Sequence, residues 1–242
     1  MFTVSLIGPD GAGKTTVARA LQQELPMPVR YLYMGVSADS SNRLLPTTRI
    51  VRAVKRARGA PPDTAGPPDP STLFKPRPKG ALKRAAASAK AGLRLANRLA
   101  EEWSRQYVAW RHVRQGTVVV FDRHFFFDYY SYDVAGGTGR PLSRRLHGFL
   151  LAHAYPKPDL VIYLDAPPEV LLARKGEGTI ETLARRRDEY LSLADVAEHF
   201  AVVDASQPLE VVTSQVAALI TDFAAARRGG GSAATPVTDA RA

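Results

Sequence analysis

The sequence predicts an α/β domain in which helices cover both faces of a parallel sheet. Two observations carry this prediction. Apolar runs of strand length alternate with segments of helical composition, which is typical of strands that are buried on both faces. A glycine-rich loop also joins the first run to the first helical segment. The apolar runs are residues 2–7, 29–34, 117–121, 160–164 and 200–203.

The loop after the first run fits the phosphate-binding pattern G-x-x-x-x-G-K-[ST], as GPDGAGKT. Its glycines let backbone N–H groups turn inward around phosphate oxygens, and the next helix adds the positive end of its dipole. A chance glycine-rich turn is the alternative, which the setting between a strand and a helix disfavours. The sequence therefore predicts a nucleoside triphosphate site, with a lysine at the β/γ bridge and a threonine hydroxyl on Mg²⁺. Its residues are Gly8, Gly11, Ala12, Gly13, Lys14, Thr15 and Thr16.

Composition sets the expected setting. The chain has 242 residues, of which 45% are hydrophobic, enough for one domain over 1–228 with a substantial core. There are no cysteines, which excludes disulfides and thiolate metal sites. No charged leader is expected before the loop, and no apolar stretch is expected to approach the roughly 20 residues of a membrane helix. We expect a soluble, cytoplasmic protein without a membrane partner.

The positive charge is concentrated in one segment. Residues 36–100 hold 14 Lys and Arg against three Asp, a net charge of +11, and the chain as a whole has +10. A Pro-rich stretch, 60–78, divides this segment. Like charges and Pro-rich spacers are typical of solvated, mobile insertions. We expect a basic insertion between the second and third strands, and a disordered tail over 229–242.

A long helix is expected from Ala81 through Gln115, before the third strand. Gly116 follows it as a C-cap. Its larger apolar residues are expected to face the core, and these are Leu93, Trp103, Tyr107, Trp110 and Val113.

Polar residues follow the apolar runs at the edge where ligands bind in open parallel sheets. Asp122, Arg123 and His124 follow the third run, Asp165 the fourth, and Asp204 the fifth. An Asp that ends a strand beside a phosphate loop is the expected partner of Mg²⁺, so Asp122 joins Thr15 as a candidate metal ligand. An ordinary helix N-cap is the alternative for Asp122.

These motifs together resemble the thymidylate kinases of the nucleoside monophosphate kinase group. The resemblance rests on residues 8–16, on 122–124 with Gly116 before them, on 163–170 and on 203–210. It implies a P-loop NTPase fold of three layers, with a five-stranded parallel sheet in the order 2-3-1-4-5. It also implies ATP-dependent phosphoryl transfer with Mg²⁺, and it raises the expectation of a homodimer formed through helices that flank the third strand.

The resemblance implies a role for several further residues. Asp10 would orient the phosphate acceptor, and Arg123 would face the acceptor side. Arg174 and the lid arginines Arg185 and Arg187 would supply cations for the transferred phosphate. Arg186 is expected at the surface, and a solvated basic helix paired with Glu177, Glu181, Asp188 and Glu189 is the alternative for this region. The loop against adenine would be Ala205, Ser206, Gln207 and Pro208.

The acceptor half departs from the family pattern. Residues 33–38 stand where the family has an Arg-Glu-Pro-Gly element, and the aromatic run 125–132 stands where it has an Ala-Tyr-Gln-Gly element. That run either stacks a base or sugar or belongs to the core. Asp128 and Asp133 are either acceptor ligands or turn residues. The predicted function is therefore transfer of the ATP γ-phosphate to dTMP or a related nucleotide or nucleoside. A kinase of another small acceptor and an NTP-dependent nucleic-acid-binding protein remain as alternatives.

Overall fold

The computed structural model describes residues 1–35, 37, 41, 43–59, 80–135, 140–176 and 178–229. The Pro-rich stretch 60–78, Glu177 and the tail from residue 230 on lie outside the described residues. The expectations for these parts therefore stay predictions.

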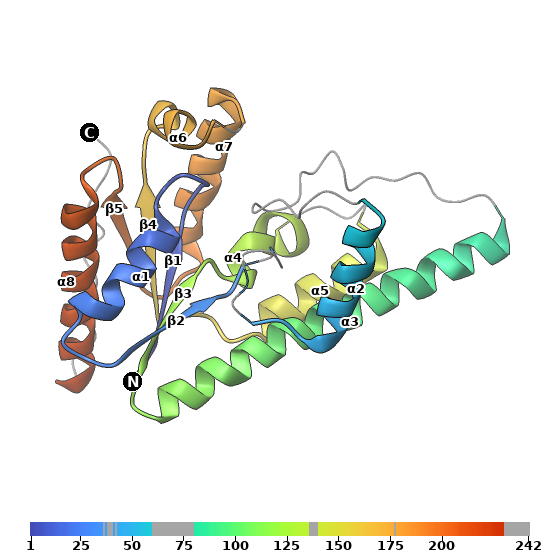
Figure 1. Ribbon diagram of the computed structural model, residues 1–242, viewed down its shortest axis with the longest axis horizontal. Helices are drawn as coiled ribbons and strands as arrows, with labels where there is room; N and C mark the ends of the chain where they lie inside the picture. The colour runs from blue at the N-terminus through green and yellow to red at the C-terminus, as the bar shows by residue number, and fades with distance from the viewer. Residues whose placement is uncertain are drawn as a thin grey trace. The chain divides into compact units, whose positions relative to one another are not determined.

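The sheet has five parallel strands in the order β2-β3-β1-β4-β5 (Figure 1). Both the strands and their order agree with the prediction, and the fold is that of P-loop NTPases. Strand β1 pairs with β3 on one side and with β4 on the other, so the chain leaves the middle of the sheet directly into the phosphate loop. The strands are β1 (Thr3–Ile7), β2 (Val29–Tyr33), β3 (Val118–Asp122), β4 (Leu160–Asp165) and β5 (Phe200–Asp204).

The described chain divides into two compact units. The first comprises residues 1–34, 108–124 and the described residues from Lys157 on, and it holds the whole sheet. The second comprises the described parts of 35–107 and 125–156, and it is helical. Most of the predicted insertion 36–100 belongs to this second unit. One kinase domain over 1–228 stays a prediction.

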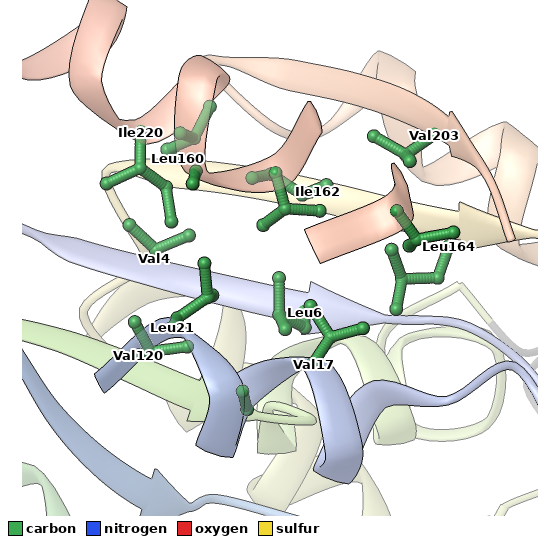
Figure 2. Close-up of a cluster of buried hydrophobic side chains, with 14 of the residues drawn as sticks. Val4, Leu6, Val17, Leu21, Val120, Leu160, Ile162, Leu164, Val203 and Ile220 are labelled. Carbon is green, nitrogen blue, oxygen red and sulfur yellow. The ribbon is translucent and has the colours of Figure 1, made fainter. Parts of the chain in front are cut away.

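The core of the first unit lies between the sheet and two helices, α1 (Lys14–Glu24) and α8 (Leu209–Arg228). Figure 2 shows how alternate strand residues meet these helices, among them Val4, Leu6 and Ile162 with Leu21 of α1 and Ile220 of α8. All five side chains are fully buried. This packing fixes where β1 ends and α1 begins, and thereby the position of the loop between them.

Helices α6 (Pro168–Lys175) and α7 (Ile180–Leu191) also belong to the first unit, and η3 (Ser192–Asp195) continues α7. Tyr190 of α7 stacks on Tyr163 of β4, whose side chain points away from the Ile162 face. By length and composition alone, α8 would also suit a membrane span, contrary to the expectation that no apolar stretch approaches that length. Its buried residues, Val212, Val216, Ile220 and Phe223 among them, account for its apolar character as a core helix.

The second unit is built from α2 (Pro46–Ala57), most of α3 (Ala81–Arg114), α4 (Phe125–Tyr129), η2 (Tyr130–Val134) and α5 (Leu142–His153). Phe125, Phe126, Phe127 and Tyr129 are buried, which agrees with the core interpretation of the aromatic run. Element η2 is one turn of π-helix, a local widening that is frequent at specialised sites.

The extent of α3 agrees with the prediction, and Gly116 has a left-handed φ of +81°. Its neighbour Thr117 donates to His112 O at 3.1 Å, which closes a Schellman cap. The predicted core face of α3 is wrong. Leu93 and Tyr107 are 73% and 65% exposed, Trp103 and Trp110 are also exposed, and Val113 is only partly buried.

Polar residues form the buried face of α3 instead, chiefly Glu101, Glu102, Arg105 and Gln106. Burial of Glu101, Glu102 and Arg105 is possible because these three find charged or hydrogen-bonding partners inside the unit. Arg105 donates to Gly35 O at 3.0 Å and lies 3.5 Å from Glu101, while Glu102 contacts His147. Apolar character alone therefore gave the wrong helix face.

Candidate nucleotide site

The phosphate loop owes its shape to glycines in left-handed or otherwise positive-φ conformations. Gly8, Gly11 and Gly13 have φ of +144°, +92° and +83°. A Cβ at Gly8 would stand 2.7 Å from Leu164 O, so the loop also needs glycine there to pass the end of β4. The loop therefore leaves β1 close against the end of its neighbour β4, at the edge where ligands bind in this fold.

Lys14 begins α1 and is 5% exposed. Its Nζ donates to Pro9 O at 2.6 Å, so the ammonium group folds back over the loop that it follows. A buried ammonium is stabilised by such a carbonyl and by any anion that binds in the loop. This geometry suits the predicted role of Lys14 at a phosphate.

Thr15 and Asp122 lie together, as the sequence predicted. Thr15 Oγ1 donates to Asp122 Oδ2 at 2.5 Å, and the Tyr31 hydroxyl donates to the same oxygen at 3.1 Å. The other oxygen, Oδ1, is buried and has no hydrogen-bond partner among the described residues. A hydroxyl beside a carboxylate with an unpaired oxygen fits Mg²⁺, which takes few protein ligands and keeps waters and phosphate oxygens.

The described residues contain no cluster of three or more His, Cys, Asp or Glu side chains that could hold a metal ion. The described residues thus do not indicate a metal site whose ligands come mainly from protein side chains. The pair Thr15 and Asp122 would act together with the phosphates of a nucleotide.

Asp10 and Arg123, predicted separately for the acceptor side, form an ion pair within the first unit. Arg123 has a φ of +67°, the only positive φ among the described non-glycine residues. Strained backbone of this kind is typical of functional sites and persists when the surrounding contacts hold it. Here Arg123 N donates to Leu6 O at 3.0 Å while the guanidinium reaches Asp10.

Four cations surround the Asp10 carboxylate. Burial raises its pKa, but these charges outweigh that effect and hold the pKa below its usual value. In order of influence they are Arg123, Lys14, Lys175 and Arg186. Asp10 therefore stays ionised at neutral pH and can accept hydrogen bonds from a ligand.

His124, which completes the motif with Asp122 and Arg123, is fully buried. Burial lowers its pKa to about 3, so the imidazole is neutral at physiological pH. It cannot supply a further cation to a phosphate.

Arg174 contacts the loop that was predicted to lie against adenine. Its guanidinium donates to Ala205 O at 2.7 Å and to Ser206 O at 3.3 Å, so it links α6 to the loop between β5 and α8. The same loop is shaped by Asp204, whose carboxylate accepts from Ser206 N at 2.9 Å and from Gln207 Nε2 at 3.2 Å. Pro208 then stands before the first turn of α8.

The three consecutive arginines of α7 have different surroundings. Arg187 donates to both oxygens of Asp165 at 2.7 Å. Arg185 is exposed and lies 3.9 Å from Glu189. Arg186, expected at the surface, is close enough to lower the pKa of Asp10.

Three residues of this site were not predicted from the sequence. Tyr31 lacked a signal because its hydroxyl reaches Asp122 only through the pairing of β2 with β3. Lys175 lies 3.8 Å from Asp10, and the run Arg174-Lys175 could have drawn attention to it. Arg186 was expected at the surface, because the directions of three neighbouring arginines depend on the orientation of α7. Asp133, predicted as an acceptor ligand or turn residue, pairs instead with Arg144 and His147.

The family model described as thymidylate kinase matches residues 61–216. A probable thymidylate kinase of Archaeoglobus fulgidus is 36% identical over 118 residues, which cover 46% of this chain and 57% of the relative. The thymidylate kinase of Alteromonas mediterranea is 36% identical over 126 residues, covering 45% and 52%. Probable thymidylate kinase 1 of Saccharolobus solfataricus is 32% identical over 114 residues, covering 45% and 57%. The chain thus spans somewhat more than half the length of these curated relatives.

Proposed function

Since the chain belongs to the thymidylate kinase family, we propose that it transfers the γ-phosphate of ATP to dTMP or to a related nucleotide or nucleoside. One observation supports this most directly. The phosphate loop, Lys14 and the pair of Thr15 with Asp122 lie at one edge of a parallel sheet within a single compact unit. A kinase needs these groups in one place because phosphoryl transfer depends on positioning and charge neutralisation.

For the donor half, we assign phosphate binding to the loop from Gly8 to Thr16. Its backbone N–H groups and the start of α1 would hold the phosphate oxygens, and Lys14 would neutralise charge at the β/γ bridge. Thr15 and Asp122 would hold Mg²⁺, which neutralises charge on the phosphates when it is bound. Adenine would lie against the loop 205–208, which Arg174 holds in place through two carbonyls.

For the acceptor half, Asp10 is the proposed orienting group. Its ionised carboxylate can accept a hydrogen bond from a sugar hydroxyl, and Arg123 holds it in place. Arg186 and Lys175 bring further positive charge to this side. Outside Asp10 and Arg123, the departures from the family pattern leave dTMP, another nucleotide, a nucleoside or another small acceptor as the candidates.

A cytoplasmic location is part of the proposal, and the absence of cysteine is in keeping with a reducing compartment.

A homodimer through α3 is also proposed. Trp103 and Tyr107 are exposed four residues apart on this helix, and aromatic side chains are enriched at interfaces. Sedimentation of a Tyr107→Glu variant against the parent chain tests the dimer.

Coupled measurement of ADP release with a panel of acceptors tests the proposed function. The panel comprises dTMP, other nucleoside monophosphates, nucleosides and phosphorylated sugars, each with ATP and Mg²⁺. We expect turnover that depends on one acceptor class and falls by roughly 10²–10³ in Lys14→Ala, as when one preorganised donor is removed from a charge-stabilising site. Acceptor-independent ADP release, or full activity in the folded Lys14→Ala variant, would overturn the proposal.

A further inference from the structure

Helix α2 exposes aliphatic side chains in a strongly basic segment. Ile50, Val51 and Val54 are 64%, 53% and 45% exposed. None of the residues of α2, all of which the structure describes, is buried. An amphipathic helix in a folded unit normally turns its apolar side inward, so this exposure calls for an explanation.

Three hydrogen bonds hold the start of α2 to α3. Leu45 N donates to Glu101 Oε1 at 2.9 Å just before the helix. Thr47 Oγ1 donates to Asn97 Oδ1 at 2.9 Å, and Asn97 Nδ2 donates to Thr48 Oγ1 at 3.0 Å. These polar contacts fix the first turn on α3, while the aliphatic side chains of the later turns are left at the surface.

The charge around these aliphatic side chains is of one sign. A rotation of about 100° per residue places Arg49, Arg52, Lys55 and Arg56 on the arc opposite Ile50 and Val54. Residues 43–59 contain no acidic residue. The helix therefore has an aliphatic side and a basic side, which is the pattern of helices that lie in a lipid–water interface.

The first half of α3 repeats this combination in the same unit. Leu82 and Leu93 are 85% and 73% exposed. Residues 80–100 include Lys83, Arg84, Lys90, Arg94 and Arg98 and no acidic residue. Two helices joined through Asn97 thus combine exposed aliphatic side chains with positive charge.

We propose that α2, supported by the first half of α3, docks the protein on an anionic lipid bilayer. Ile50, Val51 and Val54 enter the region between headgroups and acyl chains, and the arginines and lysines of the basic side contact the anionic headgroups. This interaction goes beyond the proposed kinase activity and departs from the expectation of no membrane partner. It is peripheral, because α2 has only 12 residues and cannot span a bilayer.

Two other occupants fit the same surface less well. Nucleic acid would pair with the cations but would leave the aliphatic side chains in water, and α2 offers no aromatic ring for stacking on bases. A second copy of α2 would bring like charges together, since neither copy carries an acidic residue to neutralise them. A bilayer supplies both an apolar phase and negative charge.

Co-sedimentation of the full chain with lipid vesicles tests this proposal. One set of vesicles contains phosphatidylcholine with phosphatidylglycerol, and the other contains phosphatidylcholine alone. We expect binding to the anionic set that weakens as salt rises. Ile50→Gln/Val54→Gln should weaken it by at least about tenfold, and Arg49→Gln/Lys55→Gln by roughly fivefold per charge removed.

The matched control is Leu142→Gln/Leu146→Gln, which removes two exposed aliphatic side chains from α5 and should leave vesicle binding unchanged. Circular dichroism shows that each variant is folded. Equal binding to both kinds of vesicle, or undiminished binding by Ile50→Gln/Val54→Gln, would overturn the proposal. Binding of single-stranded DNA but not of vesicles would also overturn it. So would self-association of the parent chain that is lost in Ile50→Gln/Val54→Gln.

Discussion

Arg187 forms a two-point ion pair with Asp165, in which Nε and Nη2 each donate to a different carboxylate oxygen at 2.7 Å. Asp165 also accepts from the Tyr163 hydroxyl at 2.9 Å. The pair joins α7 to the end of β4. Arg187, predicted as a lid cation for the transferred phosphate, thus has a strong structural partner in this conformation.

Replacement of Arg187 by Ala should lower the free energy of unfolding by about 1–2 kcal/mol, because a paired and partly buried carboxylate loses two charged hydrogen bonds. The figure is at the lower end for charged bonds because the arginine side chain is 37% exposed. Arg185→Ala, at an exposed position, should change stability by less than about 0.5 kcal/mol. Urea unfolding measures both. A fall in kcat for Arg187→Ala with unchanged stability would identify Arg187 as a phosphate cation instead.

Asp122 and Asp10 should respond differently to substitution by asparagine. We expect Asp122→Asn to raise the Mg²⁺ concentration needed for half-maximal rate, because the unpaired oxygen of the carboxylate is lost as a charged ligand. Asp10→Asn should raise the acceptor KM and leave ATP binding intact. Asp188→Asn, exposed on α7, serves as the control. Equal loss of ATP affinity in the Asp122 and Asp10 variants would contradict this division of roles.

His147 should make stability depend on pH. It is fully buried between Asp133, 2.7 Å from Nδ1, and Glu102, 3.2 Å from Nε2. Burial lowers its pKa, but its hydrogen bonds to the two carboxylates raise the pKa above the ordinary value of 6.5. The stabilisation is therefore fully present below pH 6.5 and is lost as pH rises through the folded-state pKa.

Chemical denaturation of the parent chain and of His147→Gln over a pH series measures this effect. The variant should be less stable by roughly 3–5 kcal/mol on the acid side, because two buried carboxylates lose a charged partner. The difference in the free energy of unfolding between the parent chain and the variant should narrow as pH rises through the folded-state pKa of His147. His153→Gln, at an exposed histidine, should show neither effect. A gap that is constant across the series would show that His147 is not protonated in the folded state.

Gly148 of α5 should not tolerate a side chain. A Cβ there would stand 1.6 Å from Asp133 O, so Gly148→Ala must displace the π-helical turn that carries Asp133. We expect a loss of at least about 3 kcal/mol in the free energy of unfolding. Gly92→Ala in α3 meets no atom within 4 Å and should stabilise the protein by about 0.5–1 kcal/mol. Thermal unfolding compares the two, and similar stabilities would contradict the close packing of α5 on η2.

The local parts of the fold and site were predictable from the sequence by itself. Apolar runs located the five strands, the spacing from Gly8 to Thr15 located the phosphate loop, and Gly116 marked the end of α3. Each of these depends on backbone conformation or on burial over a few neighbouring residues, which local residue types dictate. The strand order came from the resemblance to a family and not from the runs.

Only the tertiary structure decided which side chains meet. Three arginines in succession point in directions about 100° apart, so their order in the chain does not say that Arg187 reaches Asp165 and that Arg186 acts on Asp10. The buried face of α3 was equally hidden, because the buried Glu102 is paired with His147, 45 residues further along the chain. Contacts of this kind depend on packing between distant segments, and a buried charge cannot be recognised until its partner is in place.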